Sequence, residues 1–488
     1  QQLADSAAFS TATQVARSFN FYAYTNRANI SGLVAAASLH GYMSLASSVP
    51  SMFKAAEYNF YIMAMEEIGW CCACPWCSCV QHCIEAIRDI RTARRYRREA
   101  NSHANDVKDL DKTFVKVMKA LDYHVRHIAL QQRAMMLWTI DTLRNDKVTN
   151  KLLSAYAEGA KAAGANLGIA SGVGALNVAE YWSAGLTQGA AVLTGDKAKK
   201  RAKWLGTEIA NGTRYKKFVN KRNLGTVLLG IFPTTLLDLT YGIPRPGLSF
   251  PIAVKGESRV IEKGTSVEGQ IGSNQHGPEG KAIGAADKGL IFSYRWHALS
   301  VLPYYARLGS GKDDGEHKCK HISCCDDQSQ HRFQCLGADD IATHNCFTIF
   351  NLSKEAKDDF NQPRIYAAIE QDLRSTRGVR NGKLPWEINQ SGKVTYDFGQ
   401  VGKGEVQVSD TKNGLAISKA LVYYHHPDWQ NSKNGWKEPP NFFNPYWRAK
   451  LQPFRNVAEF SKVVVATGRT DLTTALLGGG LTGSLPLP

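Results

Sequence analysis

The spacing of apolar residues predicts long helices in the first part of the chain. Residues 1–30 contain neither proline nor glycine, and one helical face collects residues at three- and four-residue steps, namely Leu3, Ala7, Thr11, Val15, Ser18 and Tyr22. We therefore expect a helix from Gln1 to Ile30. Pro50 predicts the beginning of another helix, which ends near Trp70.

A second long helix is predicted from about Ile84 to Asn145. Its apolar positions step by three or four residues through Leu110, Phe114, Val117, Leu121, Val125 and Ile128. A pattern of this length favours an antiparallel helical hairpin with the N-terminal helices.

Residues 154–195 are rich in alanine and glycine. Gly168 and Gly172 form one G-x-x-x-G spacing, and Gly185 and Gly189 form another. In a long helix this spacing lets two backbones touch, so we expect these glycines at an assembly surface. A loop or a locally packed helix is the alternative interpretation.

Beyond Leu224 the pattern changes to the two-residue period of half-buried strands. The alternating sets are Leu290, Phe292, Tyr294 and Trp296, then Val394, Tyr396 and Phe398, then Val406 and Val408. The predicted fold class is α+β: long N-terminal helices form a hairpin or bundle, and a β-rich C-terminal region follows. We expect a helical region over 1–150, an Ala/Gly-rich and basic segment over 151–222, a β-rich domain over 223–457 and a tail over 458–488.

Composition places the chain among globular proteins. It has 488 residues, of which 43% are hydrophobic and 21% charged, and it contains no apolar run long enough to predict a membrane span and no visible signal peptide. The net charge is +16, and much of it is concentrated in three clusters: Arg88, Arg91, Arg94, Arg95, Arg97 and Arg98; Lys197, Lys199, Lys200, Arg201 and Lys203; Arg214, Lys216, Lys217, Lys221 and Arg222. Such clusters indicate either solvated helix faces or the binding of a polyanion.

Eleven cysteines fall into two clusters. The first is Cys71, Cys72, Cys74, Cys77, Cys79 and Cys83, and the second is Cys319, Cys324, Cys325, Cys335 and Cys346. Close clusters favour disulfides in an extracellular protein, and we expect pairing across the local turn within each cluster, with at least one cysteine left free or intermolecular. The alternative is a metal site, because Cys74 and Cys77 have zinc-ribbon spacing near His82 and the second cluster also contains histidines. The prediction that we favour has no metal and no cofactor.

The common catalytic motifs are missing from the sequence. We find no Walker A loop, no G-x-G-x-x-G after a strand, no G-x-S-x-G and no H-E-x-x-H. Cys74-Pro75-Trp76-Cys77 is typical of a redox dithiol, but no thioredoxin-like β-α-β pattern surrounds it. The expectation is a protein without catalytic residues, that is, not an enzyme.

An aromatic block precedes the C-terminal tail. Prolines surround Phe442, Phe443, Tyr446, Trp447 and Phe454. We expect these rings to pack against the helical region, because prolines hold the segment extended and its aromatic side chains can then fill a neighbouring core. A carbohydrate or peptide platform is the alternative.

Two stretches give the chain a family resemblance. Near the N-terminus these are residues 5–10 (DSAAFS), 16–17 (AR) and 20–28 (NFYAYTNRA), and near the other end they are 414–427 (GLAISKALVYYHHP) and 439–451 (PPNFFNPYWRAKL). They resemble the TadG-like proteins of tight-adherence (Flp) pilus-assembly systems. The family has no catalytic motif, so the resemblance implies a cellular context and no reaction.

The resemblance implies a structural protein of the bacterial cell envelope or cell surface. It would assemble into a homo-oligomer or filament, or act with other pilus-system proteins, and its membrane anchor would lie upstream of residue 1. We expect Ala8, Thr11, Ala12 and Val15 to form an assembly surface, because a narrow seam of small side chains suits helix against helix. Nucleic acid is not a partner in this hypothesis; binding of nucleic acid or an anionic glycan through the basic clusters is the competing one.

Overall fold

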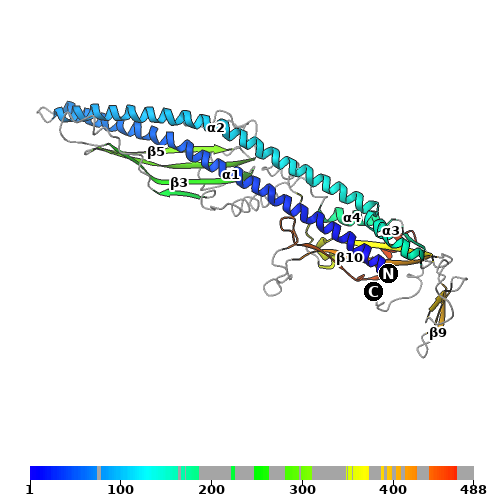
Figure 1. Cartoon of the computed structure of the whole chain (residues 1–488). Helices are drawn as coiled ribbons and strands as arrows, with labels where there is room; N and C mark the ends of the chain where they lie inside the picture. Colours follow the sequence, from blue (N-terminus) through cyan, green and yellow to red (C-terminus); the bar gives the residue numbers. More distant parts are fainter. Residues whose placement is uncertain are drawn as a thin grey trace. The chain divides into compact units, whose positions relative to one another are not determined.

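The computed structural model describes the parts of the 488-residue chain that carry its main elements. They are residues 1–73, 79–162, 166–170, 172–185, 221–225, 247–262, 281–295, 298–309, 348, 350–353, 356–372, 386–388, 393–397, 403–407, 413–425 and 439–469. The fold is α+β, as predicted: two long N-terminal helices precede antiparallel sheets (Figure 1).

The two long helices form the predicted antiparallel hairpin. Helix α1 spans Gln2–Ala73 and helix α2 spans Cys79–Arg144. The ring of Phe60 stacks on that of Tyr96 at 5.5 Å between centroids, and the Gln132 amide donates to Thr25 Oγ1 at 2.8 Å. Phe60, late in α1, meets Tyr96, early in α2, whereas Thr25, early in α1, meets Gln132, late in α2. The two helices therefore run in opposite directions. None of the helices that the structure describes has an apolar stretch suited to crossing a bilayer.

The prediction of a helix break at Pro50 was wrong. Pro50 lies inside α1, which continues without interruption from Gln2 to Ala73. A proline removes one backbone donor and costs about 3 kcal/mol in a helix interior. Burial of the flanking side chains Met43, Met52 and Phe53 offsets that cost, which a local rule does not see.

The chain divides into two compact units made of interleaved segments. Unit 1 comprises Gln1–Arg27, Leu130–Ala191 and Phe347–Pro488, and unit 2 comprises Ala28–Ala129 and Val192–Cys346. These units differ from the four consecutive regions expected from the sequence, because each long helix contributes to both of them.

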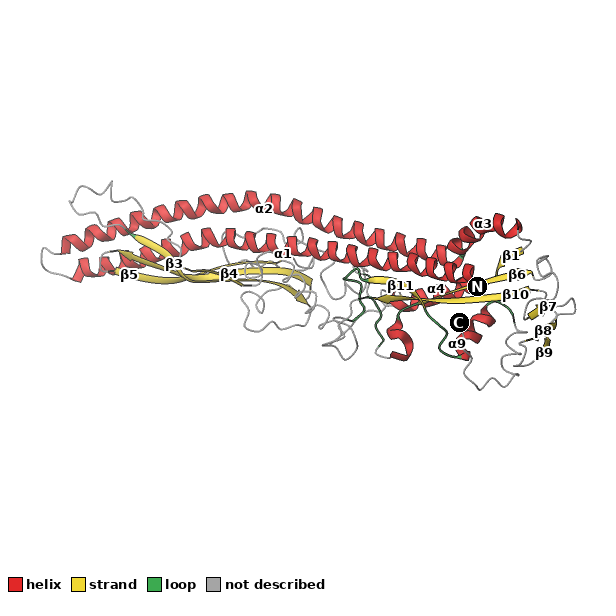
Figure 2. Cartoon of the chain, turned by 60° about the horizontal axis from the view of Figure 1, so that its bottom comes forward, coloured by secondary structure: helices red, strands yellow, loops and turns green. Residues whose placement is uncertain are grey.

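Unit 1 is built around a four-stranded antiparallel sheet (Figure 2). The strands lie in the order β1 (Asn166–Ile169), β6 (Arg364–Asp372), β10 (Asn413–Tyr424) and β11 (Trp447–Leu451). The same unit contains α3 (Lys147–Ala162), α4 (Val173–Gly185), the 3-10 helix η4 (Ala356–Asn361) and α9 (Val457–Ala466).

Both faces of the unit 1 sheet are buried. On one face, Ile365 and Val422 belong to a core that also holds Val15 and Phe19 of α1. On the other face, Tyr366, Ala368 and Ile417 pack with Val173 of α4 and with Val463 and Val464 of α9. Burial on both faces explains why β6 and β10 contain apolar residues at consecutive positions.

The outer edge of β6 is closed by more than a strand. Strand β1 pairs with residues 369–372, and the Ala170 N–H donates to the Ala368 carbonyl at 3.1 Å. At Tyr366 the Asn177 side chain takes over: its amide donates to the Tyr366 carbonyl at 2.9 Å and its oxygen accepts from the Tyr366 N–H at 2.8 Å. Asn177 thus supplies from α4 the two bonds that a neighbouring strand would make.

Unit 2 contains the second four-stranded antiparallel sheet, in the order β2-β3-β4-β5. The strands are β2 (Lys221–Gly225), β3 (Leu248–Glu262), β4 (Lys281–Arg295) and β5 (Ala298–Gly309). The sheet lies alongside the unit 2 parts of α1 and α2 (Figures 1 and 2).

A small third sheet follows in sequence. Strands β7 (Trp386–Ile388), β8 (Lys393–Asp397) and β9 (Lys403–Gln407) pair antiparallel. The alternation at Val394 and Tyr396 therefore predicted strand β8 correctly, and Val406 lies in strand β9. Phe398 and Val408 lie outside the described residues.

Candidate functional site

The side of the unit 2 sheet that does not face the helices is apolar. Cross-strand register on β3, β4 and β5 sets its residues in three rows: Leu248, Tyr294 and Leu299; Phe250, Phe292 and Val301; Ile252, Leu290 and Pro303. We call these residues the outer face. Leu299 is 58% exposed, Tyr294 41% and Val301 40%. The outer face is therefore a contiguous apolar surface, and the adjoining row on the same side of the sheet carries the exposed Lys255 and Lys288.

The opposite side of the same sheet, the inner face, meets the helices with apolar and polar side chains. Ser249, Ser293 and Ser300 form one buried cross-strand row. Asn59 of α1 lies on this row: its amide donates to the Ile291 carbonyl at 2.8 Å and to Ser293 Oγ at 3.0 Å, and its oxygen accepts from Ser300 Oγ at 2.8 Å. Hydrogen bonds therefore satisfy the polar row of an interface that also has an apolar core.

The alternation at Leu290, Phe292 and Tyr294 predicted β4 correctly, and Trp296 lies outside the described residues. The residues between them, which sequence inspection passed over, face the helices. Asp287, Ser293 and Arg295 are all buried, and Asp287 accepts a bond from Ser44 Oγ at 2.6 Å. The sequence did contain a signal for the buried side of β4: Asp287, Ser293 and Arg295 all lie at the positions that alternate with those of the apolar residues.

A buried ionic cluster joins the inner face to α2. The Arg295 guanidinium lies 3.0 Å from the Asp89 carboxylate and donates to Thr92 Oγ1 at 2.5 Å. Burial raises the pKa of Asp89 from 3.8 to about 7; Arg295 opposes the rise, and the nearby carboxylates of Glu85 and Glu67 add to it. Burial decides the direction because Asp89 and Arg295 both have almost no exposed surface.

Two further ion pairs belong to the same buried cluster. Arg88 donates to Glu85 at 2.8 Å, and His82 lies 2.7 Å from Glu67. Arg88 is buried, so one member of the first basic cluster in the sequence does not contribute to the protein surface. The cluster therefore combines three carboxylates with two guanidinium groups and one imidazole.

The first cysteine cluster supplies one disulfide among the described residues. Cys71 at the end of α1 bonds to Cys83 near the start of α2, with 5.2 Å between the Cα atoms. This is a bond within the cluster and across the turn, as predicted. Cys72 is exposed and has no disulfide partner among the described residues, and Cys79 is buried. Cys74, Cys77, Cys319, Cys324, Cys325, Cys335 and Cys346 lie outside those residues.

The structure brings no metal-binding set together in its described part. Neither cysteine, histidine nor carboxylate side chains gather there in groups of three that could hold an ion. Cys71 and Cys83 are held in the disulfide, and His82 is paired with Glu67. The zinc alternatives that need Cys74, Cys77 or the second cluster fall outside the described residues.

The small-residue seam of α1 lies inside unit 1. Ala8, Ala12 and Val15 have no exposed surface and Thr11 is buried. The first three belong to the core that contains Tyr181 of α4 and Ile365 of β6. The seam therefore allows close packing, but the partner in this structure is the chain's own core rather than a neighbouring chain.

The G-x-x-x-G interpretation was wrong for Gly168 and Gly172. Gly168 lies in strand β1, and Gly172 lies in the turn before α4 with φ of 93°. A Cβ at Gly172 would lie 1.9 Å from the Ala466 carbonyl oxygen. Gly172 is therefore required by a left-handed turn and a close approach to α9. Gly185 is the last residue of α4, and Gly189 lies outside the described residues.

The two stretches that carry the family resemblance meet in unit 1. Asn20 of α1 donates to the Trp447 carbonyl and accepts from its N–H, both at 3.0 Å. Asn26 donates to the Phe442 carbonyl at 2.7 Å, and the Phe19 ring lies 4.7 Å from that of Phe442. Phe442 and Trp447 are buried, so this part of the aromatic block packs against the helices as predicted.

Unit 1 also contains an ionic cluster between its sheet and α9. Lys419 of β10 has no exposed surface, and its ammonium donates to both oxygens of Glu459 at 2.8 and 2.9 Å. Burial lowers the pKa of Lys419. Burial alone would raise the pKa of Glu459, but the bond from the Arg455 N–H and the contact with Lys419 hold it below its ordinary value. The pair is therefore charged and mutually dependent.

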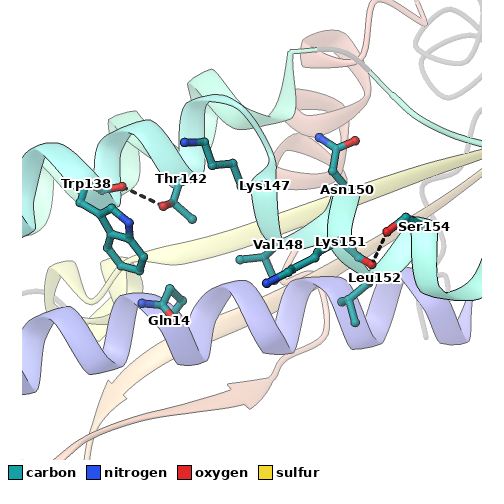
Figure 3. A pocket seen from close by; sticks show the side chains of 9 residues that line it. All are labelled: Gln14, Trp138, Thr142, Lys147, Val148, Asn150, Lys151, Leu152 and Ser154. Carbon is teal, nitrogen blue, oxygen red and sulfur yellow. Dashed lines mark hydrogen bonds between the residues drawn. The ribbon is translucent and has the colours of Figure 1, made fainter.

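A groove of about 890 Å³ opens in unit 1 between the start of α1, the end of α2 and α3 (Figure 3). Trp138 and Gln14 lie on one side, and Val148, Lys151 and Leu152 line it further along. Lys147 forms an ion pair with Asp141. The lining offers indole, amide and ammonium groups but no carboxylate, histidine or cysteine, so it suits contact with a ligand better than acid–base chemistry.

In comparison with known proteins, no protein-family model, curated protein or solved structure matches the chain.

Proposed function

We propose that this chain is a non-enzymatic structural protein of the bacterial cell envelope or cell surface, which assembles with further copies of itself into a pilus-like or other surface filament. The observation that carries the proposal is the outer face of unit 2. Contiguous exposed apolar surface is typical of a protein–protein contact. It lies on the side of the sheet that does not face the helices of the unit.

Charge favours a second copy as the occupant of the outer face. The chain carries a net charge of +16, so two copies repel each other through most of their surfaces. The outer face has no charged side chain and so lacks that repulsion. Burying Leu299, Val301 and their neighbours would remove apolar surface from water, which stabilises a contact by about 25 cal/mol per Å².

The family resemblance supports the same proposal from a different part of the chain. The N-terminal stretch and the C-terminal stretch pack on each other through Phe19, Asn20, Phe442 and Trp447. The similarity to TadG-like proteins therefore falls on one packed module of unit 1. Such a module is consistent with a pilus-system protein that has no catalytic site.

The test replaces apolar residues on β5 and measures assembly. Leu299→Ser with Val301→Ser should leave the fold intact by circular dichroism and abolish the oligomers or filaments seen by sedimentation velocity and electron microscopy. The matched control is Leu352→Ser with Leu451→Ser, two exposed leucines of unit 1, which should assemble like the wild type. A wild-type protein that stays monomeric at high concentration, or a deletion without a filament phenotype, would refute the proposal.

A further inference from the structure

We infer that one face of α2, over residues 91–119, binds a linear anionic polysaccharide. The first part of this face carries Arg91, Arg94 and Arg98, all exposed, with Arg95 half-buried beside them. The positions differ by three or four residues, so on a helix they project from the same side.

The same side of the helix continues with lysines. Lys108, Lys112, Lys116 and Lys119 are all exposed and again differ by three or four residues. At 100° per residue the arginine and lysine groups lie on the same side of the helix, with residues 99–107 between them, and from residue 91 to residue 119 this side is about 42 Å long at 1.5 Å per residue. We call this side the basic face.

Packing fixes the direction of the basic face. The opposite side of α2 is buried within unit 2 through Ala93, Tyr96, Ala104, Phe114 and Met118. Tyr96 stacks on Phe60 of α1, and Phe114 meets His40 with 5.0 Å between ring centroids. The helix therefore cannot rotate to hide its basic residues, which stay presented to solvent.

Few carboxylates neutralise this charge. Asp109 pairs with Lys112 at 2.8 Å, and at the margin of the face Asp106 lies 3.5 Å from His103. Lys108, Lys116 and Lys119 form no ion pair with any residue that the structure describes. A row of cations with few carboxylates beside it releases counterions when a polyanion replaces them, which is a strong, sequence-independent source of affinity.

The shape of the face selects among polyanions. The phosphates of duplex DNA wind around an axis with a turn of about 34–36 Å, so a straight 42 Å row cannot follow one strand. Single-stranded nucleic acid is usually held by aromatic side chains that stack on its bases, and residues 91–119 place no exposed aromatic residue on the basic face. An extended polysaccharide with one acidic group per sugar needs neither feature.

A lipid surface fits less well. Helices that lie on membranes insert an apolar face into the bilayer. The apolar face of α2 is already buried against the rest of unit 2. The inference does not depend on the proposed assembly, because the outer face and the basic face share no residue.

The experiment measures binding of the full chain to polygalacturonate by isothermal titration at several salt concentrations. Lys108→Gln, Lys116→Gln and Lys119→Gln together should weaken binding at least tenfold. The slope of log affinity against log salt should fall by about 2, since each lost contact contributes about 0.7. The matched control is Lys450→Gln, Lys255→Gln and Lys288→Gln, three exposed lysines elsewhere, which should change affinity less than twofold.

Three outcomes would overturn the inference. The first is equal weakening by the two triple variants, which would mean that the net charge of the chain, and not the basic face, determines the affinity. The second is tighter binding of oligo-dT than of polygalacturonate through the same lysines, which would make nucleic acid the ligand. The third is binding of vesicles with 30 mol% anionic lipid but not of polygalacturonate. Circular dichroism of both variants checks that the helices are intact.

Discussion

The two four-stranded sheets differ in what covers them and in what they bury. In unit 1, apolar side chains such as Ile365 and Ile417 lie on both sides of the sheet, and elements of the unit pack on both sides. In unit 2, the side that meets the helices combines apolar residues such as Ile291 with serines and the charged Arg295, and the other side exposes apolar residues. Unit 1 is therefore apolar on both sides of its sheet, whereas unit 2 buries a mixed side and exposes an apolar one.

The contrast teaches that a half-buried strand can carry apolar residues on both sides and bury a polar row between them. The inner face of unit 2 is held by bonds that need particular partners, such as Asn59 and Thr92. Buried polar groups are costly when a partner is lost, so such an interface is specific but intolerant of substitution. The following changes test this difference between the units.

The largest effect is expected at the ion pair of unit 1. Glu459→Gln leaves the Lys419 ammonium, which has no exposed surface, with a neutral partner. An uncompensated buried charge costs about 3–5 kcal/mol, so the free energy of unfolding should fall by that amount in a denaturant titration. Asp109→Asn, which breaks the exposed pair with Lys112, is the control and should cause no measurable change. Equal effects would mean that burial does not govern these pairs.

The next effect is expected at the polar interface of unit 2. Asn59→Ala removes three hydrogen bonds, to the Ile291 carbonyl, Ser293 and Ser300. At about 1 kcal/mol each, the loss in unfolding free energy should be about 3 kcal/mol. Ser38→Ala is the control, because its hydroxyl bonds only the Val34 carbonyl of its own helix. A loss no larger than the control's would show that the serine row does not hold the sheet to α1.

A pH-dependent effect is expected at Asp89. Its pKa is about 7 in the folded chain and 3.8 ordinarily, so the folded state binds the proton more tightly. The stabilisation from this group is complete below pH about 4 and is lost as the pH rises through 7, about 3 kcal/mol between pH 5 and pH 8. Urea titrations at both pH values should show a smaller difference for Asp89→Asn than for the wild type. Unchanged pH dependence in the variant would contradict the assignment.

The smallest effect on stability is expected on the outer face. Leu299→Ala should lower the unfolding free energy by no more than about 0.5 kcal/mol, because Leu299 is 58% exposed. Ile365→Ala in unit 1, at a position with no exposed surface, should cost about 2–5 kcal/mol. Thermal melting of the two variants gives the comparison. A large loss at Leu299 would mean that its contacts lie within the monomer.

The local patterns of the sequence predicted elements better than contacts. Three- and four-residue periods identified α2 and the first thirty residues of α1, because one side of each is buried along much of its length. Pro50 misled because tertiary packing outweighs a single lost hydrogen bond. The two-residue period identified β4 but not its buried side, since both alternating sets were compatible with a strand.

The candidate sites depended on residues distant in sequence, which no local pattern connects. Asp89 and Arg295 are far apart along the chain, as are Lys419 and Glu459, and each is an unremarkable charged residue in its own segment. The cysteine cluster was more informative, because short spacing limits the pairs that can form and favours a bond such as Cys71–Cys83. The glycine spacing misled because Gly172 serves a turn.

The Asn177 side chain has a consequence for how copies of the chain can join. An open strand edge is a template onto which a strand from another molecule can add, by β-augmentation or in uncontrolled aggregation. Along β6 that template is occupied, by β1 at residues 369–372 and by Asn177 at Tyr366. Joining through this edge is therefore blocked, and Asn177→Ala would reopen one position of it to strand exchange between copies.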